Sequence, residues 1–153
     1  MAAPKIEIKS TTPDRLSLTV KRFLKKAELH AHPRFLKFTK RSSKYLPSFC
    51  FNNCEDESKK TGAKIVYGWA IWQDKKKNFI EAEFHSVIFE NNKLFDITPR
   101  HDNECLIMFV PDKQRKAIRV EKDMWDTWSS IKYFQGVFTP TSNILVKVAP
   151  HKK

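Results

Sequence analysis

The chain has 153 residues, a formal net charge of +12 and 41% hydrophobic residues, among them twelve Phe and four Trp. This length and apolar content predict one folded domain with a single core and exclude global disorder. Because the chain has only three Gly, a glycine-rich phosphate loop is nearly excluded. The positive charge favours acidic partners such as nucleic acid or an acidic protein, although a solvated lysine-rich surface would give the same balance.

The three cysteines, Cys50, Cys54 and Cys105, form no CxxC pair and are odd in number. This pattern indicates neither a disulfide scaffold nor a zinc ribbon, and it favours a reducing cytoplasm. The first ten residues lack the apolar segment of a signal peptide, and no apolar run approaches the roughly 18 residues that span a bilayer. We therefore expect a cytoplasmic protein without membrane contact, whose loose ends are residues 1–11 and 149–153.

A first helix is predicted to begin at Thr12-Pro13, with Thr12 as the N-cap and Pro13 at the first helical position. Apolar residues at helical spacing carry it to about His30. Its opposite face is basic, which suits either solvent or an anion.

The segment 33–47 is basic and has aromatic residues between its charges. In one interpretation Phe35, Phe38 and Tyr45 stack on bases while the basic side chains meet phosphates. In the other, the segment is a connector whose aromatic side chains cover the core. The candidate nucleic-acid or anion-binding residues are Arg34, Lys37, Lys40, Arg41 and Lys44.

A second helix is predicted over residues 49–60, with Ser48 as its cap and Gly62 at its end. Cys50 would lie in the first turn, where unpaired backbone N–H groups and the helix dipole stabilise a thiolate. Asn53 and Cys54 follow along the same face of this helix.

Residues 64–97 predict three consecutive antiparallel strands, at 64–73, 79–90 and 93–97. The Asn91-Asn92 pair suits a two-residue hairpin loop because Asn tolerates a positive φ. In that register Glu90 pairs with Lys93, and His85 and Asp96 are diagonal neighbours on one face.

Other residues on these strands would then surround His85. Glu81 and Glu83 share its face, where they would tune the imidazole, bind a cationic substrate or pair with surface lysines. Trp69 and Trp72 point to opposite faces, so at most one of them lines the site, and Trp69 is the candidate.

The rest of the chain predicts short strands at 106–110 and 116–120, a helix over 121–134 and a final strand at 143–148. The helix depends on apolar residues near helical spacing, which are Met124, Trp125, Trp128 and Ile131. No repeat or domain boundary is visible, so residues 1–153 are expected to form a single α+β domain in which an antiparallel sheet packs against the helix that carries Cys50.

The residues Cys50, His85 and Asp96 supply a thiol, a base and a carboxylate that would orient the base. Thiol catalysis needs these three groups, and the N-terminus of a helix adds N–H groups that stabilise an oxyanion. Cys54 is the rival nucleophile, but it lies deeper in the helix. Each of these residues would also fit a purely structural role, since a buried Cys commonly packs as a small hydrophobe.

The order of these motifs resembles the transglutaminase-like branch of the papain-like superfamily. The resemblance runs from FCFNN (49–53) through YGW (67–69) and EAEFHSV (81–87) to LFDITP (94–99), about the middle third of the chain. It is also similar to small bacterial proteins with the same C-x-x-N, G-W, H-S-V and D-I-T-P arrangement. The resemblance implies a papain-like core with Cys50 as nucleophile, His85 as base and Asp96 as orienter. Asn53 would assist, and neither a cofactor nor a metal is implied.

Two classes of function follow. The first is a thiol hydrolase or acyltransferase on an amide or isopeptide bond of a protein or peptide-like substrate. The second is a non-catalytic module of the same fold whose basic surface holds nucleic acid or an acidic protein. A metal site is a weaker interpretation, because no recognised ligand spacing links its candidates, which are His85, Asp96, His101 and Cys105, or His30 with His32.

Overall fold

The computed structural model describes residues 7–101 and 104–148, so the expectations for residues 1–6 and 149–153 lie outside it. The helical elements are α1 (Leu18–Lys26), α2 (Cys50–Thr61) and a 3₁₀ turn, η1 (Lys75–Lys77). The strands are β1 (Arg34–Lys37), β2 (Lys64–Asp74), β3 (Phe79–Glu90), β4 (Lys93–Phe95), β5 (Leu106–Pro111), β6 (Ile118–Glu121), β7 (Met124–Trp128), β8 (Ile131–Phe134), β9 (Val137–Thr139) and β10 (Asn143–Lys147).

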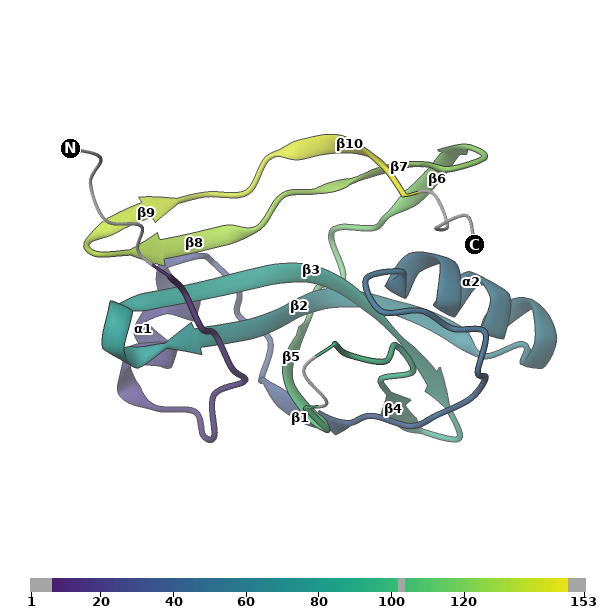
Figure 1. Ribbon diagram of the computed structural model, residues 1–153, viewed down its shortest axis with the longest axis horizontal. Helices are drawn as coiled ribbons and strands as arrows, with labels where there is room; N and C mark the ends of the chain where they lie inside the picture. Colours follow the sequence, from purple (N-terminus) through teal and green to yellow (C-terminus); the bar gives the residue numbers. More distant parts are fainter. Residues whose placement is uncertain (1–6, 102–103, 149–153) are drawn as a thin grey trace.

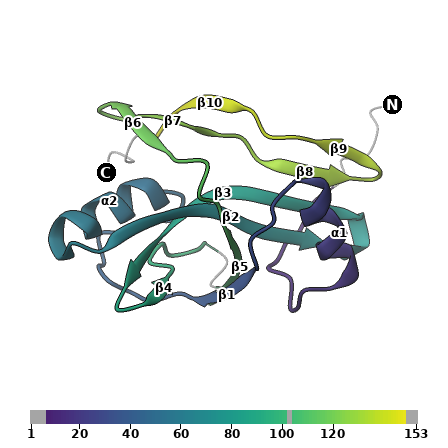
Figure 2. The same ribbon diagram turned by 180° about the vertical axis from the view of Figure 1, so that it is seen from behind.

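These strands form two sheets, whose named strands all pair antiparallel. The larger sheet has the order β1-β5-β2-β3-β8-β9, with β4 as an additional partner of β3. The smaller sheet has the order β10-β7-β6. Figures 1 and 2 show that β7 continues into β8 and β9 into β10, so that these four strands form one long ribbon, which β8 joins to the edge of β3. The predicted mixture of helices and antiparallel sheet is therefore correct.

The hairpin at the centre of the large sheet follows the predicted register. Asn91 and Asn92 have φ of 52° and 63°, the positive values that a primed two-residue turn requires. Glu90 pairs with Lys93, and the pairing continues to Ile88 opposite Phe95. The period-2 pattern thus correctly assigned the side chains of these strands to opposite faces.

The first helix begins later than the sequence predicts. Ser17, not Thr12, is its N-cap, and the Ser17 hydroxyl accepts from the Val20 N–H. The segment before it joins the sheet instead, since Thr11 forms a bridge with Gln73 and the Thr12 hydroxyl accepts from the Met108 N–H. These long-range hydrogen bonds outweigh the local capping preference.

The second helix is where it was predicted, but Ser48 does not cap it. Ser48 has a φ of 68°, and Phe49 occupies the N-cap position without a side-chain hydrogen bond to the helix. Gly62 ends the helix in the left-handed conformation, at φ 75°, as expected of a C-terminal glycine. Cys50 is the first residue of α2, so its N–H lies in the uncapped first turn.

The predicted helix over residues 121–134 is wrong, because this segment forms β7 and β8. Burial alternates along β7, with Trp125 and Thr127 buried and their neighbours half-buried. Aromatic and β-branched residues suit such a half-buried strand, and pairing with β10 and β6 settles the choice. The strand predictions for 106–110 and 143–148 are correct, and the one for 116–120 is displaced to β6.

The segment 33–47 contains a strand that the sequence analysis did not predict, β1, which pairs with β5. The connector interpretation fits the rest, because Tyr45 is buried under α2 with Cys54 and Ile88. Phe35 remains 43% exposed.

The two faces of β3 pack against different parts of the molecule. Phe84 and Ile88 face α2, since the Phe51 and Phe84 rings lie 6.1 Å apart and Cys54 packs with Ile88. On the face of His85 and Val87, the side chains of Phe109 and Ile107 from β5 in the same sheet form a second cluster with Val87, and the Phe109 ring packs against His85. The body of α2 therefore does not cover the His85 face, and only its N-terminal end approaches the histidine.

Candidate active site

His85 and Asp96 are in direct contact. The His85 Nε2 lies 3.0 Å from the Asp96 Oδ1, and the two residues are 8% and 1% exposed. The hairpin turn produces this contact, because it pairs β4 with residues 88–90 of β3 and so brings Asp96, the residue after β4, near His85. The Thr98 backbone N–H donates to the same carboxylate oxygen and helps to fix it.

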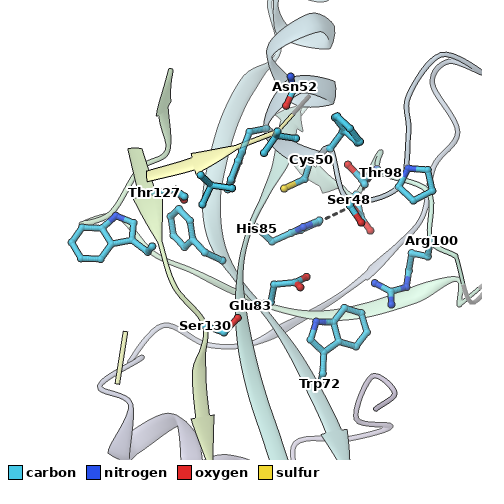
Figure 3. A pocket seen from close by; sticks show the side chains of 18 of the residues that line it. Ser48, Cys50, Asn52, Trp72, Glu83, His85, Thr98, Arg100, Thr127 and Ser130 are labelled. Carbon is cyan, nitrogen blue, oxygen red and sulfur yellow. Dashed lines mark hydrogen bonds and ion pairs between the residues drawn. The ribbon is translucent and has the colours of Figure 1, made fainter. Parts of the chain in front are cut away.

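Cys50 acts on the same imidazole from the end of α2. Burial alone would lower the pKa of His85, but the charges of Cys50 and Asp96 and the hydrogen bond with the Asp96 carboxylate raise that pKa well above its usual value. Figure 3 shows the half-buried Cys50 side chain directed toward the His85 ring. The structure thus brings together the thiol, imidazole and carboxylate that the sequence singled out.

His85 lies where β3 changes partners. On one edge β3 pairs with β2 along its whole length. On the other edge β8 pairs with residues 79–82 and β4 with residues 88–90, so residues 83–87 face neither strand. The end of α2 reaches His85 through this interruption.

Gly68 allows β5 to pack closely beside His85. It pairs with His85 across the β2–β3 ladder, and a Cβ at this position would lie 2.6 Å from Phe109 Cζ and closer still to the Val110 carbonyl oxygen. The Phe109 ring in turn packs edge-on against His85, with centroids 6.3 Å apart. Glycine in the YGW motif therefore permits the close packing that supports the imidazole.

A pocket of about 520 Å³ opens onto Cys50 and His85. Its walls come from the end of α2, the middle of β3, the segment after Asp96 and the strands β7 and β10 (Figure 3). This volume lies within the range of small-ligand sites. Both sheets line the pocket, so it exists only in the assembled fold.

Asn53 does not line this pocket. It is 4% exposed, and its side-chain amide donates to the Leu46 carbonyl at 2.9 Å and to the Thr98 hydroxyl at 3.1 Å. It therefore ties α2 to the loop before Cys50 and to the segment after Asp96.

Trp69, proposed from sequence as a site residue, lies elsewhere. It is fully buried in the main core, and its indole N–H donates to Asp112. Trp72, on the opposite face of β2, lines the pocket instead, with the Arg100 guanidinium 3.9 Å from the centre of its ring. Glu83 lines the pocket and is exposed. Burial and the nearby charge of Glu83 raise the pKa of Glu81. The Glu81 Oε2 lies 4.0 Å from the Lys132 Nζ.

The other two cysteines have different surroundings. Cys54 is fully buried, and burial raises the pKa of its thiol far above the usual value. Cys105 is exposed. Cys50 is thus the cysteine that lines the pocket beside His85.

The basic residues of segment 33–47 do not act alike. The Arg41 guanidinium lies 3.2 Å from a Glu57 oxygen and 2.9 Å from a Glu90 oxygen, so it forms ion pairs within the fold. Tyr45 donates to Glu57 at 2.6 Å and is not available for base stacking. The remaining four, Arg34, Lys37, Lys40 and Lys44, are exposed.

The sequence did not single out the contribution of β7 and β10 to the pocket. Thr127, Ile144 and Val146 line it, but their segments are distant in sequence from Cys50 and His85. Because residues 121–134 were predicted to form a helix, the side of a strand on which Thr127 lies could not be predicted. Arg100 immediately follows the DITP motif, which was the one local signal for it.

Comparisons with known proteins give no relative. No family model matches the chain, and neither a curated protein nor a solved structure is significantly similar to it. Within residues 7–101 and 104–148, no group of three or more His, Cys, Asp or Glu side chains is placed to hold a metal ion. The described part of the chain also contains no helix that is long and apolar enough to cross a membrane.

Proposed function

We propose that the chain is a thiol-dependent hydrolase or acyltransferase of the transglutaminase-like branch of the papain-like superfamily. The observation that carries this proposal is that one buried imidazole interacts with a carboxylate and a thiol at once, at the mouth of a pocket. The odd, unpaired cysteines support a reducing, cytoplasmic location for such an enzyme.

The first chemical step uses the two nitrogens of His85. Because Nε2 faces Asp96, Nδ1 is the nitrogen left to accept the Cys50 proton. The resulting thiolate attacks the carbonyl carbon of an amide, while Asp96 stays ionised and stabilises the imidazolium.

The uncapped first turn of α2 would hold the oxyanion that forms in this attack. The imidazolium then gives its proton to the leaving amine, the C–N bond breaks, and a thioester forms on Cys50. Water or an amine, deprotonated by His85, attacks the thioester and restores the thiol. Hydrolysis, deamidation and transamidation share this acyl-enzyme and differ in the amine that leaves or the nucleophile that resolves the thioester.

Alkylation of the three cysteines tests the proposal within one molecule. Iodoacetamide should modify Cys50 faster than exposed Cys105 near neutral pH, and Cys54 should remain unmodified in the folded protein, as measured by peptide mass spectrometry. In His85→Gln the excess rate at Cys50 should disappear, while the Cys105 rate stays the same and reports an intact fold.

A second measurement tests the acyl-enzyme. With p-nitrophenyl acetate, a burst of nitrophenolate equal to the enzyme concentration and an acetyl group on Cys50 are expected, and both should be absent in Cys50→Ser. Equal alkylation of Cys50 and Cys105, together with acetylation that does not depend on His85, would rule the proposal out. Adding methylamine distinguishes transamidation, which yields N-methylacetamide, from hydrolysis.

A further inference from the structure

We infer that the small sheet supplies a substrate subsite for an aliphatic side chain, and that Thr127 and Asn52 hold the amide groups next to it. This inference rests on the proposed function, because it places the acyl donor of that reaction in the same pocket.

Thr127 is the observation from which the argument starts. It is 3% exposed and lines the pocket, yet its hydroxyl oxygen has no hydrogen-bond partner among the described residues. A buried hydroxyl without a hydrogen-bond partner lowers the stability of the folded state, and native proteins rarely contain one. A ligand that enters the pocket would supply the missing hydrogen bond.

Asn52 repeats this feature on the other side of the pocket. Its side-chain oxygen is buried and has no hydrogen-bond partner in the described part of the chain, and Asn52 is two residues beyond Cys50. Figure 3 shows Asn52 on α2, farther along the helix than Cys50, and Thr127 on β7. An amide oxygen accepts and a hydroxyl both donates and accepts, which matches the N–H and C=O groups of a peptide.

The surface near Thr127 is aliphatic. Ile144 is the cross-strand partner of Thr127, and Val146 lies two residues further on the same face of β10. Both are half-buried and line the pocket, whereas Leu145 between them is on the other face and 64% exposed. An aliphatic side chain of the substrate would cover Ile144 and Val146 and gain the free energy of apolar burial.

The chemical class of the acyl donor is therefore a peptide with a branched aliphatic residue at or beside the reacting carbonyl. The pocket of about 520 Å³ has room for such a residue and its flanking amides.

Binding to the Cys50→Ala protein tests the subsite without catalysis. In an NMR titration, we expect N-acetyl-leucine N-methylamide to bind at least about tenfold more tightly than N-acetyl-glycine N-methylamide. Thr127→Val, which keeps the shape and removes the hydroxyl, should weaken binding of the leucine compound about five- to tenfold, and Thr127→Ser should restore it. On β10, Val146→Thr should weaken binding, and Leu145→Thr on the opposite face should leave it unchanged.

The ester reaction separates this inference from the proposed function. In the wild-type chain the p-nitrophenyl ester of N-acetyl-leucine should react with a lower KM than the glycine ester, and Thr127→Val should raise KM more than it lowers kcat. Equal binding of the two amides, or no effect of Thr127→Val, would overturn the subsite even if Cys50 is acylated. Selective binding without acylation would keep the subsite and reject the thiol chemistry.

Discussion

The Nε2 of His85 lies 3.0 Å from the Oδ1 of Asp96, a residue eleven positions further along the chain. The turn at Asn91-Asn92 makes this contact a consequence of β-hairpin register. Since both side chains are almost wholly buried, the ion pair is shielded from solvent.

Replacing Asp96 with Asn should lower the pKa of His85, because the neutral amide no longer stabilises the imidazolium. NMR titration of the ring protons should show the wild-type pKa well above 6.5 and a clear downward shift in Asp96→Asn. The alkylation rate of Cys50 should fall at least about tenfold in the same variant, since an Asn can hold the wrong tautomer. Exposed His32 provides the control, as the chemical shifts of its ring protons at a fixed pH should be the same in both proteins.

The same variant should change how stability depends on pH. The pKa of His85 is raised in the folded state, so the free energy of unfolding gained from its protonation is complete below about pH 6.5 and is lost as the pH rises through the folded-state pKa. Chemical denaturation should therefore show the greatest loss for Asp96→Asn just below pH 6.5 and a smaller loss in alkaline solution. If the loss of the free energy of unfolding in Asp96→Asn grew with pH, the coupling between His85 and Asp96 would be contradicted.

Gly68→Ala should destabilise the fold because its Cβ would collide with Val110 and Phe109. Two contacts of this kind in a packed interior cost about 2 kcal/mol or more of the free energy of unfolding. Gly62→Ala offers a matched control, since a Cβ there meets nothing within 4 Å but must adopt φ 75°. Its cost should be about 1 kcal/mol, and it should leave Cys50 alkylation unchanged, whereas Gly68→Ala should slow it.

Asn53 should act as a positioning residue. Asn53→Ala leaves the Leu46 carbonyl and the Thr98 hydroxyl without their present donor and should cost about 2–3 kcal/mol in urea unfolding. Because the change loosens the segment that follows Asp96, it should also lower the His85 pKa, which a purely global loss of stability would not do. Asp56→Ala, an exposed change on the same helix, should alter the free energy of unfolding by less than about 0.5 kcal/mol.

Arg41 should contribute stability rather than nucleic-acid affinity. Arg41→Ala removes the ion-pair partner of Glu57, which is 4% exposed, and should cost roughly 2 kcal/mol of the free energy of unfolding. Lys44→Ala, nearby and exposed, should change the free energy of unfolding little. A loss of DNA affinity in Arg41→Ala with unchanged stability would reverse this assignment.

The sequence by itself determined the hairpin at the centre of the site. Two asparagines that tolerate positive φ and two strands with period-2 patterning specify which residues share a face, and this placed His85 beside Asp96. The position of Cys50 at a helix start was also readable, since Gly62 and the helical pattern fix the extent of α2. These are local properties, set within a few residues.

Tertiary structure decided everything that depends on distant partners. Residues 121–134 have helical spacing in sequence, but β10 pairs with β7 and makes them strands, which turns Thr127 into the pocket. Trp69 and Trp72 were distinguishable only once α1 had packed on one face of β2 and buried Trp69 in the main core. The meeting of Cys50 with His85 requires α2 to pack on Phe84 and Ile88 beside the break between β8 and β4, and hydrophobic packing between elements far apart in sequence leaves no local pattern to read.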